Sequence, residues 1–180
     1  FRYPNTEKDT LKNISIEIKQ GEKIAIVGEN GAGKTTFVKL LMRLYDVTDG
    51  SIKYNGCDIR EYNTHAYRKK ISAVFQDYNI YAATLAENVL LGQYDEKDKE
   101  NVIEALNKAD FSKKLEKLPN GLNTELTREF SEEGVNLSGG ESQKIAISRV
   151  FLNDEDRATS ILDEPSSALD PIAEYQLNHA

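Results

Sequence analysis

A glycine-rich stretch near the start of the chain has the spacing of a phosphate-binding loop. Residues 28–35 read Gly-Glu-Asn-Gly-Ala-Gly-Lys-Thr, which matches the pattern G-x-x-x-x-G-K-[ST]. Glycines let backbone N–H groups close around phosphate oxygens, and a helix that follows adds the positive end of its dipole. Lys34 would place a charge on the β- and γ-phosphates, and Thr35 would offer a hydroxyl to Mg²⁺. The phosphate contacts are expected from Gly28, Asn30, Gly31, Ala32, Gly33, Lys34, Thr35 and Thr36.

The elements around this loop should be a strand before it and a helix after it. Residues 24–27 form a continuous apolar run, which predicts a strand buried on both faces. Residues 14–18 alternate isoleucine with polar residues and predict a half-buried strand. After the loop, apolar side chains recur at helical spacing at Phe37, Leu40, Leu41 and Leu44. The loop is therefore expected at the beginning of an amphipathic helix.

The rest of the chain predicts an α/β core that is interrupted by helices. Asn55-Gly56 indicates a hairpin turn, and residues 71–75 a buried strand. From about residue 77 to 136 the periodicity is helical, and Thr84 with Glu87 can form a capping box. A second helix has its apolar stripe at Val102, Ile103, Leu106 and Ala109. A capped helix follows residue 137, and a short strand ends at Leu162.

Two acidic residues follow that last strand. Asp163 at a strand end can hold Mg²⁺, usually through water, and the neighbouring Glu164 can polarise an attacking water. Such a pair alone is also typical of a solvated strand end. Its position downstream of a phosphate-binding loop favours the catalytic interpretation.

Residues 137–141, Leu-Ser-Gly-Gly-Glu, form a third group. Ser138 and Glu141 have capping-box spacing, so the simplest interpretation is a helix start. Gly139 and Gly140 directly after the cap are costly in a helix, however. Because such a start exposes backbone N–H groups to an anion, phosphate binding would explain the glycines.

Together these groups resemble the nucleotide-binding domain of ATP-binding-cassette (ABC) transporters, and the similarity covers nearly the whole chain. Residues 28–35 look like Walker A, residues 161–164 like Walker B, and residues 137–141 like the signature motif of that family. The resemblance further implies a Mg²⁺-sensing glutamine, an aromatic residue that stacks on adenine and a D-loop aspartate, at Gln76, Tyr3 and Asp170. Without the resemblance, Tyr3 would be taken for a surface residue.

The implied fold is a P-loop NTPase (RecA-like) core with a parallel central sheet, an antiparallel β subdomain and an inserted α-helical subdomain. Residues 1–180 would form a single ABC-type ATP-binding domain. Residues 1–76 and 145–180 would make the core, and residues 77–144 the helical subdomain with the start of the signature motif.

The implied function is an ATP-driven motor that uses ATP and Mg²⁺ at the cytoplasmic face of a membrane. Glu164, Lys34 and Gln76 would carry catalysis, while Thr35, Gln76 and Asp163 would hold the metal. Its partners would be transmembrane domains, fused or separate, and a second nucleotide-binding domain in a head-to-tail homodimer or pseudo-dimer. Residues 84–89 and 128–134 are similar to exporter segments, although residues 129–133 also fit a solvated acidic turn.

Composition limits the alternatives. The chain has 180 residues, which suits a single domain, and one cysteine, which fits a reducing compartment. Its formal net charge of −7 disfavours nucleic acid as a partner. A soluble ABC-type ATPase acting on ribosomes or DNA is the first alternative. An ATP-binding fragment without turnover is the second. It is disfavoured for the parent domain, because Lys34, Asp163 and Glu164 are all in place, and favoured only for the 180-residue piece, which ends at Ala180, before the expected switch histidine. The chain also lacks the usual first strand, so we expect truncation at both ends.

Overall fold

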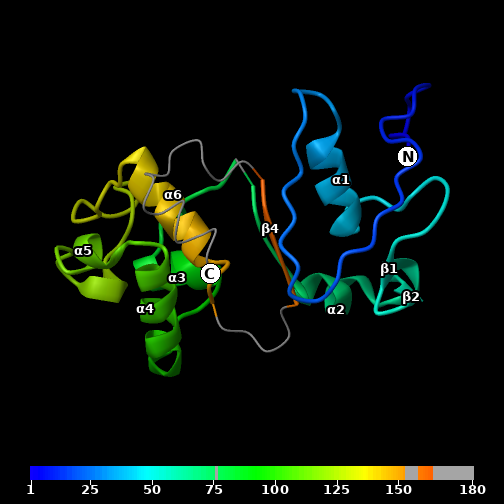
Figure 1. Ribbon diagram of the computed structural model, residues 1–180. Helices are drawn as coiled ribbons and strands as arrows, with labels where there is room; N and C mark the ends of the chain where they lie inside the picture. Colours follow the sequence, from blue (N-terminus) through cyan, green and yellow to red (C-terminus); the bar gives the residue numbers. More distant parts are fainter. Residues whose placement is uncertain (76, 153–157, 164–180) are drawn as a thin grey trace. The chain divides into compact units, whose positions relative to one another are not determined.

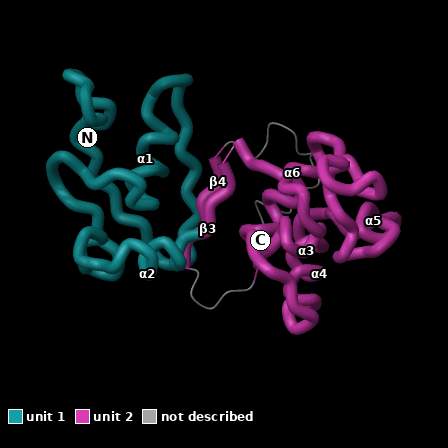
Figure 2. Tube along the Cα trace, turned by 180° about the vertical axis from the view of Figure 1, so that it is seen from behind, with its two compact units in different colours: residues 1–71 teal, residues 72–180 magenta. Residues whose placement is uncertain are grey.

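The computed structural model describes residues 1–75, 77–152 and 158–163 (Figure 1). The chain divides into two compact units, Phe1–Ile71 and Ser72–Ala180 (Figure 2). We describe each unit by itself.

The first unit contains a central helix and a small antiparallel pair. Its elements are α1 (Lys34–Leu41), β1 (Lys53–Tyr54), β2 (Cys57–Asp58), the 3-10 helix η1 (Ile59–Glu61) and α2 (Thr64–Lys69). The predicted hairpin is confirmed, since β1 and β2 pair antiparallel across Asn55 and Gly56. Both turn residues have positive φ, 50° and 81°, as a two-residue turn of the I′ kind requires. The helix predicted after the loop ends earlier than expected, and Leu44 lies beyond it with 42% of its surface exposed.

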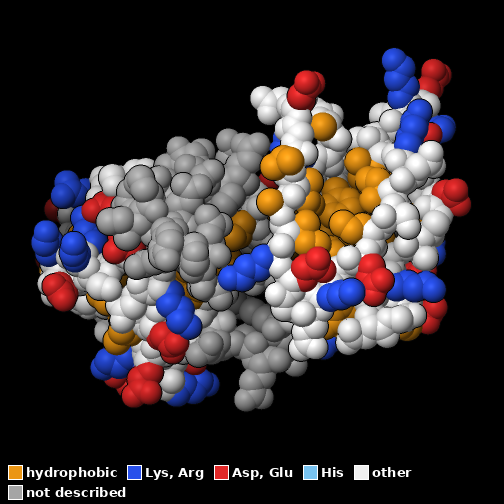
Figure 3. All heavy atoms as spheres, in the orientation of Figure 1, with side chains coloured by type: hydrophobic (Ala, Val, Ile, Leu, Met, Phe, Trp, Pro, Cys, Tyr) orange, Lys and Arg blue, Asp and Glu red, His pale blue; other side chains and the backbone are white. Residues whose placement is uncertain are grey.

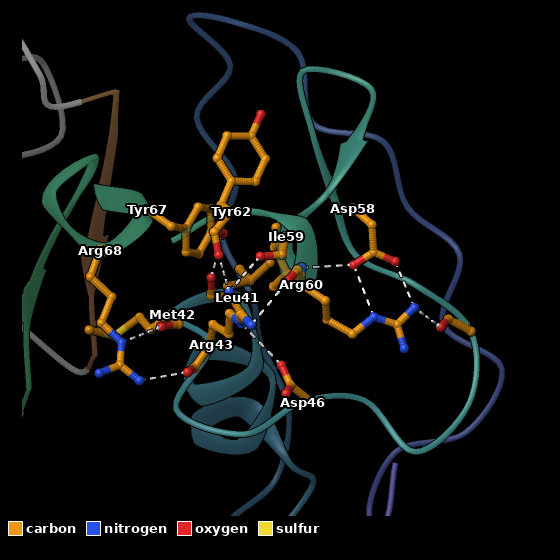
Figure 4. Close-up of polar contacts among 11 residues, drawn as sticks. Leu41, Met42, Arg43, Asp46, Asp58, Ile59, Arg60, Tyr62, Tyr67 and Arg68 are labelled. Atoms are coloured by element: carbon orange, nitrogen blue, oxygen red, sulfur yellow. Dashed lines mark hydrogen bonds and ion pairs between the residues drawn. The ribbon is translucent and has the colours of Figure 1, made fainter. Parts of the chain in front are cut away.

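Arg43, just beyond α1, ties this helix to the segment around η1 (Figure 4). Its guanidinium donates to the carbonyl oxygens of Ile59 at 2.8 Å, Tyr62 at 2.7 Å and Arg60 at 3.2 Å. A planar guanidinium can satisfy several carbonyls at once, which an ammonium cannot do with the same geometry. Arg43 itself has φ of 52°, so the chain turns sharply here to bring the side chain into place.

The two strands predicted before the loop are not present as strands. Residues 14–18 and 24–27 are irregular, and their aliphatic side chains are exposed, with Val27 at 87%. Figure 3 shows hydrophobic side chains gathered on the surface of this unit. The physical reason is that a strand needs hydrogen-bonded neighbours along its edges, and β1 and β2, each of two residues, pair with each other and not with these segments. The exposed aliphatic residues of these two segments are Ile14, Ile16, Ile18, Ile24, Ile26 and Val27.

The second unit is mainly helical. Its elements are β3 (Ile71–Val74, starting at the unit boundary), α3 (Leu85–Leu90), η2 (Glu96–Asp98), α4 (Lys99–Lys108), α5 (Ser112–Leu115), η3 (Gly121–Asn123), α6 (Gly139–Ser148) and β4 (Thr159–Leu162). Among the described residues, no helix combines the length and apolar character needed to cross a bilayer.

Helices α3, α4 and α6 enclose the main hydrophobic core. The predicted capping box is confirmed, because Thr84 accepts from the Glu87 N–H and the Glu87 carboxylate accepts from the Thr84 N–H. The predicted stripe of the second helix is also confirmed, with Val102 and Leu106 fully buried on α4. The core residues, all in this unit, are Leu85, Ala86, Val89, Val102, Ala105, Leu106, Phe111, Leu118, Leu122, Leu126, Ile145 and Leu152.

A pair of parallel strands, β3 and β4, completes the described part of this unit. The strand predicted over residues 71–75 appears as β3, and the strand predicted to end at Leu162 appears as β4. The Asp163 N–H donates to the Val74 carbonyl at 2.9 Å, so the acidic residue continues the pairing directly after β4. The last helix predicted after Pro171 lies outside the described residues.

The Arg43 contacts lead to a first prediction. Replacing Arg43 by lysine keeps the charge but loses the planar set of N–H donors that reaches several carbonyls at once. Each hydrogen bond to a charged group that is lost lowers the stability by about 1.5–3 kcal/mol. We expect amide hydrogen exchange over residues 59–62 to accelerate at least about tenfold, since tenfold corresponds to about 1.4 kcal/mol. Arg2→Lys is the control, because Arg2 forms an exposed ion pair with Asp9 instead. Equal exchange rates over residues 59–62 in the two variants would show that Arg43 does not hold this segment in place.

Candidate functional site

The glycine-rich loop leads directly into α1. Gly31 and Gly33 have φ of 84° and 95°, in the left-handed region that side chains rarely adopt, and the Ala32 N–H donates to the Glu29 carbonyl at 3.1 Å. Gly33 is the N-cap of α1 and receives no side-chain capping bond. The first N–H groups of the helix therefore have no capping side chain, and residues 28–32 are exposed.

The Lys34 side chain folds back over the loop. Its ammonium donates to the Gly28 carbonyl at 2.9 Å and to the Glu29 carbonyl at 3.2 Å. Thr35, the next residue, is exposed. The loop thus combines one fixed cation, an accessible hydroxyl and a helix N-terminus, which together suit a polyphosphate.

Close packing explains one of the glycines. A Cβ atom at Gly33 would lie 2.6 Å from Leu11 Cδ2, well inside van der Waals contact. Leu11 thus lies against the base of the loop, a contact that sequence spacing does not reveal. Gly31 has open space around its Cα, so only its backbone conformation requires glycine.

Tyr3 lies beside the first turn of α1. Its hydroxyl is 3.0 Å from the Thr36 Oγ1, and Thr36 is buried. The Tyr3 ring also packs against Phe1 and Tyr45, with centroid distances of 5.0 Å and 5.1 Å. The structure therefore brings Tyr3 together with the Thr36 end of the predicted nucleotide site.

The predicted metal and catalytic residues are only partly described. Asp163 is half-buried at the end of β4, next to the end of β3. Gln76, Glu164 and Asp170 lie outside the described residues. Asp163 belongs to the second unit, whereas Thr35 and Lys34 belong to the first.

The third motif forms the start of α6. Ser138 is the N-cap, and the Glu141 N–H donates to its Oγ at 3.3 Å, while the Glu141 carboxylate accepts from the Ser138 N–H at 2.8 Å. Ser138 and Gly139 are exposed. The expected capped helix is confirmed, with its two glycines in the first turn, where backbone N–H groups are not occupied by the helix.

Glu141 also forms an ion pair with Lys114, at 3.0 Å. Burial raises the pKa of the Glu141 carboxyl, but the Ser138 N–H and the Lys114 ammonium outweigh burial, so that its pKa lies below the ordinary value of 4.5. The negative charge at the start of α6 is thus partly neutralised by a lysine from α5. Sequence reasoning missed Lys114, because no short-range pattern connects residues 114 and 141.

The comparisons with known proteins agree with this geometry. The model of the ABC transporter family matches residues 11–167. The chain belongs to the ABC transporter family.

Individual relatives of this ABC domain point the same way. It is 46% identical over 179 residues to the subtilin transport ATP-binding protein SpaT of Bacillus subtilis, covering 98% of the chain and 28% of the relative. It is 40% identical over 180 residues to a protein of Staphylococcus aureus named for multidrug export as an ATP-binding/permease protein, covering 100% of the chain and 30% of the relative.

A solved structure is also similar to the ABC domain. A bacterial Atm1-family ABC exporter with ATP bound superposes with a TM-score of 0.84 at 32% identity, over 99% of this chain and 30% of that one. The ABC domain therefore spans less than a third of the length of these relatives. Domains of this family bind ATP and have ATPase activity, and the expected P-loop NTPase fold class and likeness to exporter domains are confirmed.

The exporter-like segment at residues 128–134 is a tight loop in the ABC domain. Arg128 Nε donates to the Gly134 carbonyl at 3.0 Å, and the Gly134 N–H donates to the Ser131 carbonyl at 3.1 Å. A Cβ at Gly134 would overlap the Thr127 carbonyl oxygen, so this position requires glycine for steric reasons. The loop presents Phe130 with 84% of its surface exposed.

The packing at Gly33 leads to a prediction for nucleotide binding. Gly33→Ala forces an alanine to φ near 95° and pushes Leu11 aside, at a backbone cost of about 1–2 kcal/mol before any clash. We expect the ATP affinity to fall at least about tenfold in equilibrium binding. Gly50→Ala is the matched control, because Gly50 has φ of 78° but nothing within 4 Å of a Cβ. Similar ATP affinities in the two variants would show that the Leu11 contact and the loop conformation do not matter.

The Glu141 ion pair leads to a prediction for pH. Because the folded pKa of Glu141 is lowered, its contribution to stability is complete above about pH 4.5 and is lost as the pH falls through the folded value. Lys114→Met removes one cause, so the pKa of Glu141 should rise and the contribution should be lost at higher pH. An NMR titration of the Glu141 carboxyl measures this. Lys113→Met is the control, and a Glu141 pKa that moves equally in both variants would refute the pairing.

Proposed function

We propose that the chain is the ATP-binding and hydrolysing motor domain of an ABC exporter. The observation that carries this proposal is the exposed glycine loop at the start of α1, with the Lys34 ammonium fixed over it. Residues 1–76 and 145–180 would form its core, and residues 77–144 its helical subdomain. The hydrophobic core around α3 and α4 supports a separate helical part, and Ile145 and Leu152 of the same cluster come from the other side of the proposed boundary.

In this proposal the loop holds the phosphates of ATP. Lys34 exchanges its two carbonyl partners for phosphate oxygens, and the backbone N–H groups of residues 28–36 complete the cradle. Tyr3 stacks on adenine, which its place beside Thr36 supports. Binding is therefore divided between a charged loop and an aromatic side chain.

The residues proposed for Mg²⁺ suit a hard cation. Thr35 offers a hydroxyl, Gln76 an amide oxygen and Asp163 a carboxylate, which are the oxygen ligands that Mg²⁺ prefers. Thr35 is accessible and Asp163 is half-buried at a strand end, so both are available as ligands. A bound magnesium ion would neutralise charge on the phosphates.

Glu164 is the proposed general base. It follows Asp163 at the end of β4 and would take a proton from the attacking water, while Lys34 stabilises charge on the γ-phosphate. Gln76 would orient the water and respond to the state of the nucleotide. The bond broken joins the γ-phosphorus to the bridging oxygen, and ADP leaves with that oxygen.

The signature motif would act on a second nucleotide-binding domain. In a head-to-tail pair, Ser138, Gly139 and Gly140 would face the phosphate loop of the partner copy, and Asp170 would lie at the same interface. The exposed start of α6 supports this role, because its capping box leaves further N–H groups free of helical partners. ATP would then hold two domains together, and hydrolysis would release them.

Transmembrane domains, fused to the chain or separate, are the proposed partners for export at the cytoplasmic face of a membrane. The relatives named for export and transport support this direction. The loop of residues 128–134 with its exposed Phe130 is the proposed contact with these domains. An exposed apolar side chain suits contact with the apolar face of a partner helix.

Glu164→Gln tests the motor. The amide keeps the shape of the side chain but cannot accept the proton, and a general base contributes about 10²–10⁴-fold to rate. In the full-length native protein, we expect ATP binding to be retained and the rate of steady-state ATP hydrolysis to fall at least about a hundredfold. Glu17→Gln, at an exposed position, controls for the loss of one carboxylate. Turnover that persists in Glu164→Gln would remove this residue from the role of base.

A further inference from the structure

Three aromatic rings meet beside α1. The rings of Tyr3 and Tyr45 are perpendicular, at 90°, with centroids 5.1 Å apart, and Phe1 meets Tyr3 at 76° and 5.0 Å. Phe1 and Tyr45 complete the group at 6.0 Å. Perpendicular contacts at these distances are the favoured arrangement of aromatic pairs, so they fix the plane of the Tyr3 ring.

Tyr45 is itself held in place by the end of α1. It follows Arg43, whose guanidinium is bonded to three carbonyl oxygens of residues 59–62. The Leu44 N–H donates to the Lys39 carbonyl at 2.9 Å, so the backbone just before Tyr45 is tied to the helix as well. The backbone next to Tyr45 is therefore held beside α1, while its side chain is 38% exposed and rests against Tyr3 and Phe1.

Tyr3 consequently contacts one residue at the start of α1 and one residue beyond its end. Its hydroxyl meets Thr36 in the first turn of α1, and its ring meets Tyr45 just beyond the last turn. Tyr3 remains partly exposed, so it keeps surface for a further contact. A ring fixed in this way loses little rotational freedom when a flat ligand stacks on it, which favours binding.

We propose that Tyr45 is a positioning residue for the base of the bound nucleotide. It sets the orientation of Tyr3 and so strengthens stacking on a purine, without touching the phosphates. This inference rests on the proposed stacking of Tyr3 on adenine. It adds a second aromatic residue, from the far end of α1, to the part of the site that recognises the base.

The test separates base recognition from phosphate binding. The full-length native protein is used, and its equilibrium binding of two ligands is measured. These are MgATP and magnesium tripolyphosphate, which has the phosphates without a base. The variants are Tyr45→Leu, Tyr45→Phe, Tyr3→Ala and the double variant of Tyr45→Leu with Tyr3→Ala. Tyr54→Leu is the matched control, because Tyr54 belongs to a different aromatic cluster, with Tyr62 and Tyr67.

The expected result is a loss specific to the base. Tyr45→Leu should weaken MgATP binding about three- to tenfold and leave tripolyphosphate binding unchanged, because a Tyr3 ring that has to be immobilised on binding reduces affinity by about that factor. Tyr45→Phe keeps the ring and should bind MgATP like the wild type, as should Tyr54→Leu. In the Tyr3→Ala background, Tyr45→Leu should have no further effect, because it acts through Tyr3.

Other results would overturn the inference in distinguishable ways. If Tyr3→Ala weakens the binding of MgATP but Tyr45→Leu does not, Tyr45 has no positioning role and the proposed function stands. If Tyr45→Leu tightens MgATP, Tyr45 covers the ring surface that the base needs. If Tyr45→Leu weakens tripolyphosphate equally, its effect is on the fold of the loop. If the wild type binds neither ligand, the proposed function itself fails.

Discussion

The first unit depends on how the two ends of α1 are held. At its start, Gly33 takes a left-handed conformation that lets the loop turn into the helix without a capping side chain. At its end, side chains from α2 occupy the last carbonyls: the Tyr67 hydroxyl donates to Leu41 at 2.7 Å, and Arg68 donates to Met42 and to the Arg43 carbonyl (Figure 4). Carbonyls at a helix C-terminus otherwise depend on water or on a special backbone turn. One end is thus open for a ligand, whereas the other end is closed by protein.

The features that sequence reasoning predicted correctly are those determined within a few residues. The capping boxes at Thr84 and Ser138 each depend on a hydrogen bond between residues three positions apart. The hairpin at Asn55-Gly56 depends on the φ angles of its two turn residues. The glycine loop belongs to the same class. The strands expected over residues 14–18 and 24–27 belong to a different class. A strand forms its hydrogen bonds with other segments of the chain, and the pattern of side chains within one segment does not show whether such a partner segment is present.

Other determinants of the site are long-range and left no pattern to find. Leu11 lies against Gly33, and Lys114 pairs with Glu141, across 22 and 27 residues of chain. Gly134 is required because its Cβ would overlap a backbone carbonyl seven residues earlier, although its conformation is ordinary. Family resemblance identified the motifs, whereas these contacts determine how firmly each motif is held. The same holds for Tyr3, whose ring is oriented by Tyr45 from beyond the far end of the helix.

The Lys34 ammonium has a consequence for which anions can occupy the loop. Two of its three N–H donors are already bonded to the carbonyls of Gly28 and Glu29, so an anion that takes more than the one remaining donor has to replace a backbone acceptor. A single phosphate or sulfate, with few further contacts, gains little from this exchange in water. A chain of phosphates that also reaches the N–H groups of the loop gains several bonds for the same loss. The loop would therefore favour a polyphosphate over a single phosphate ion.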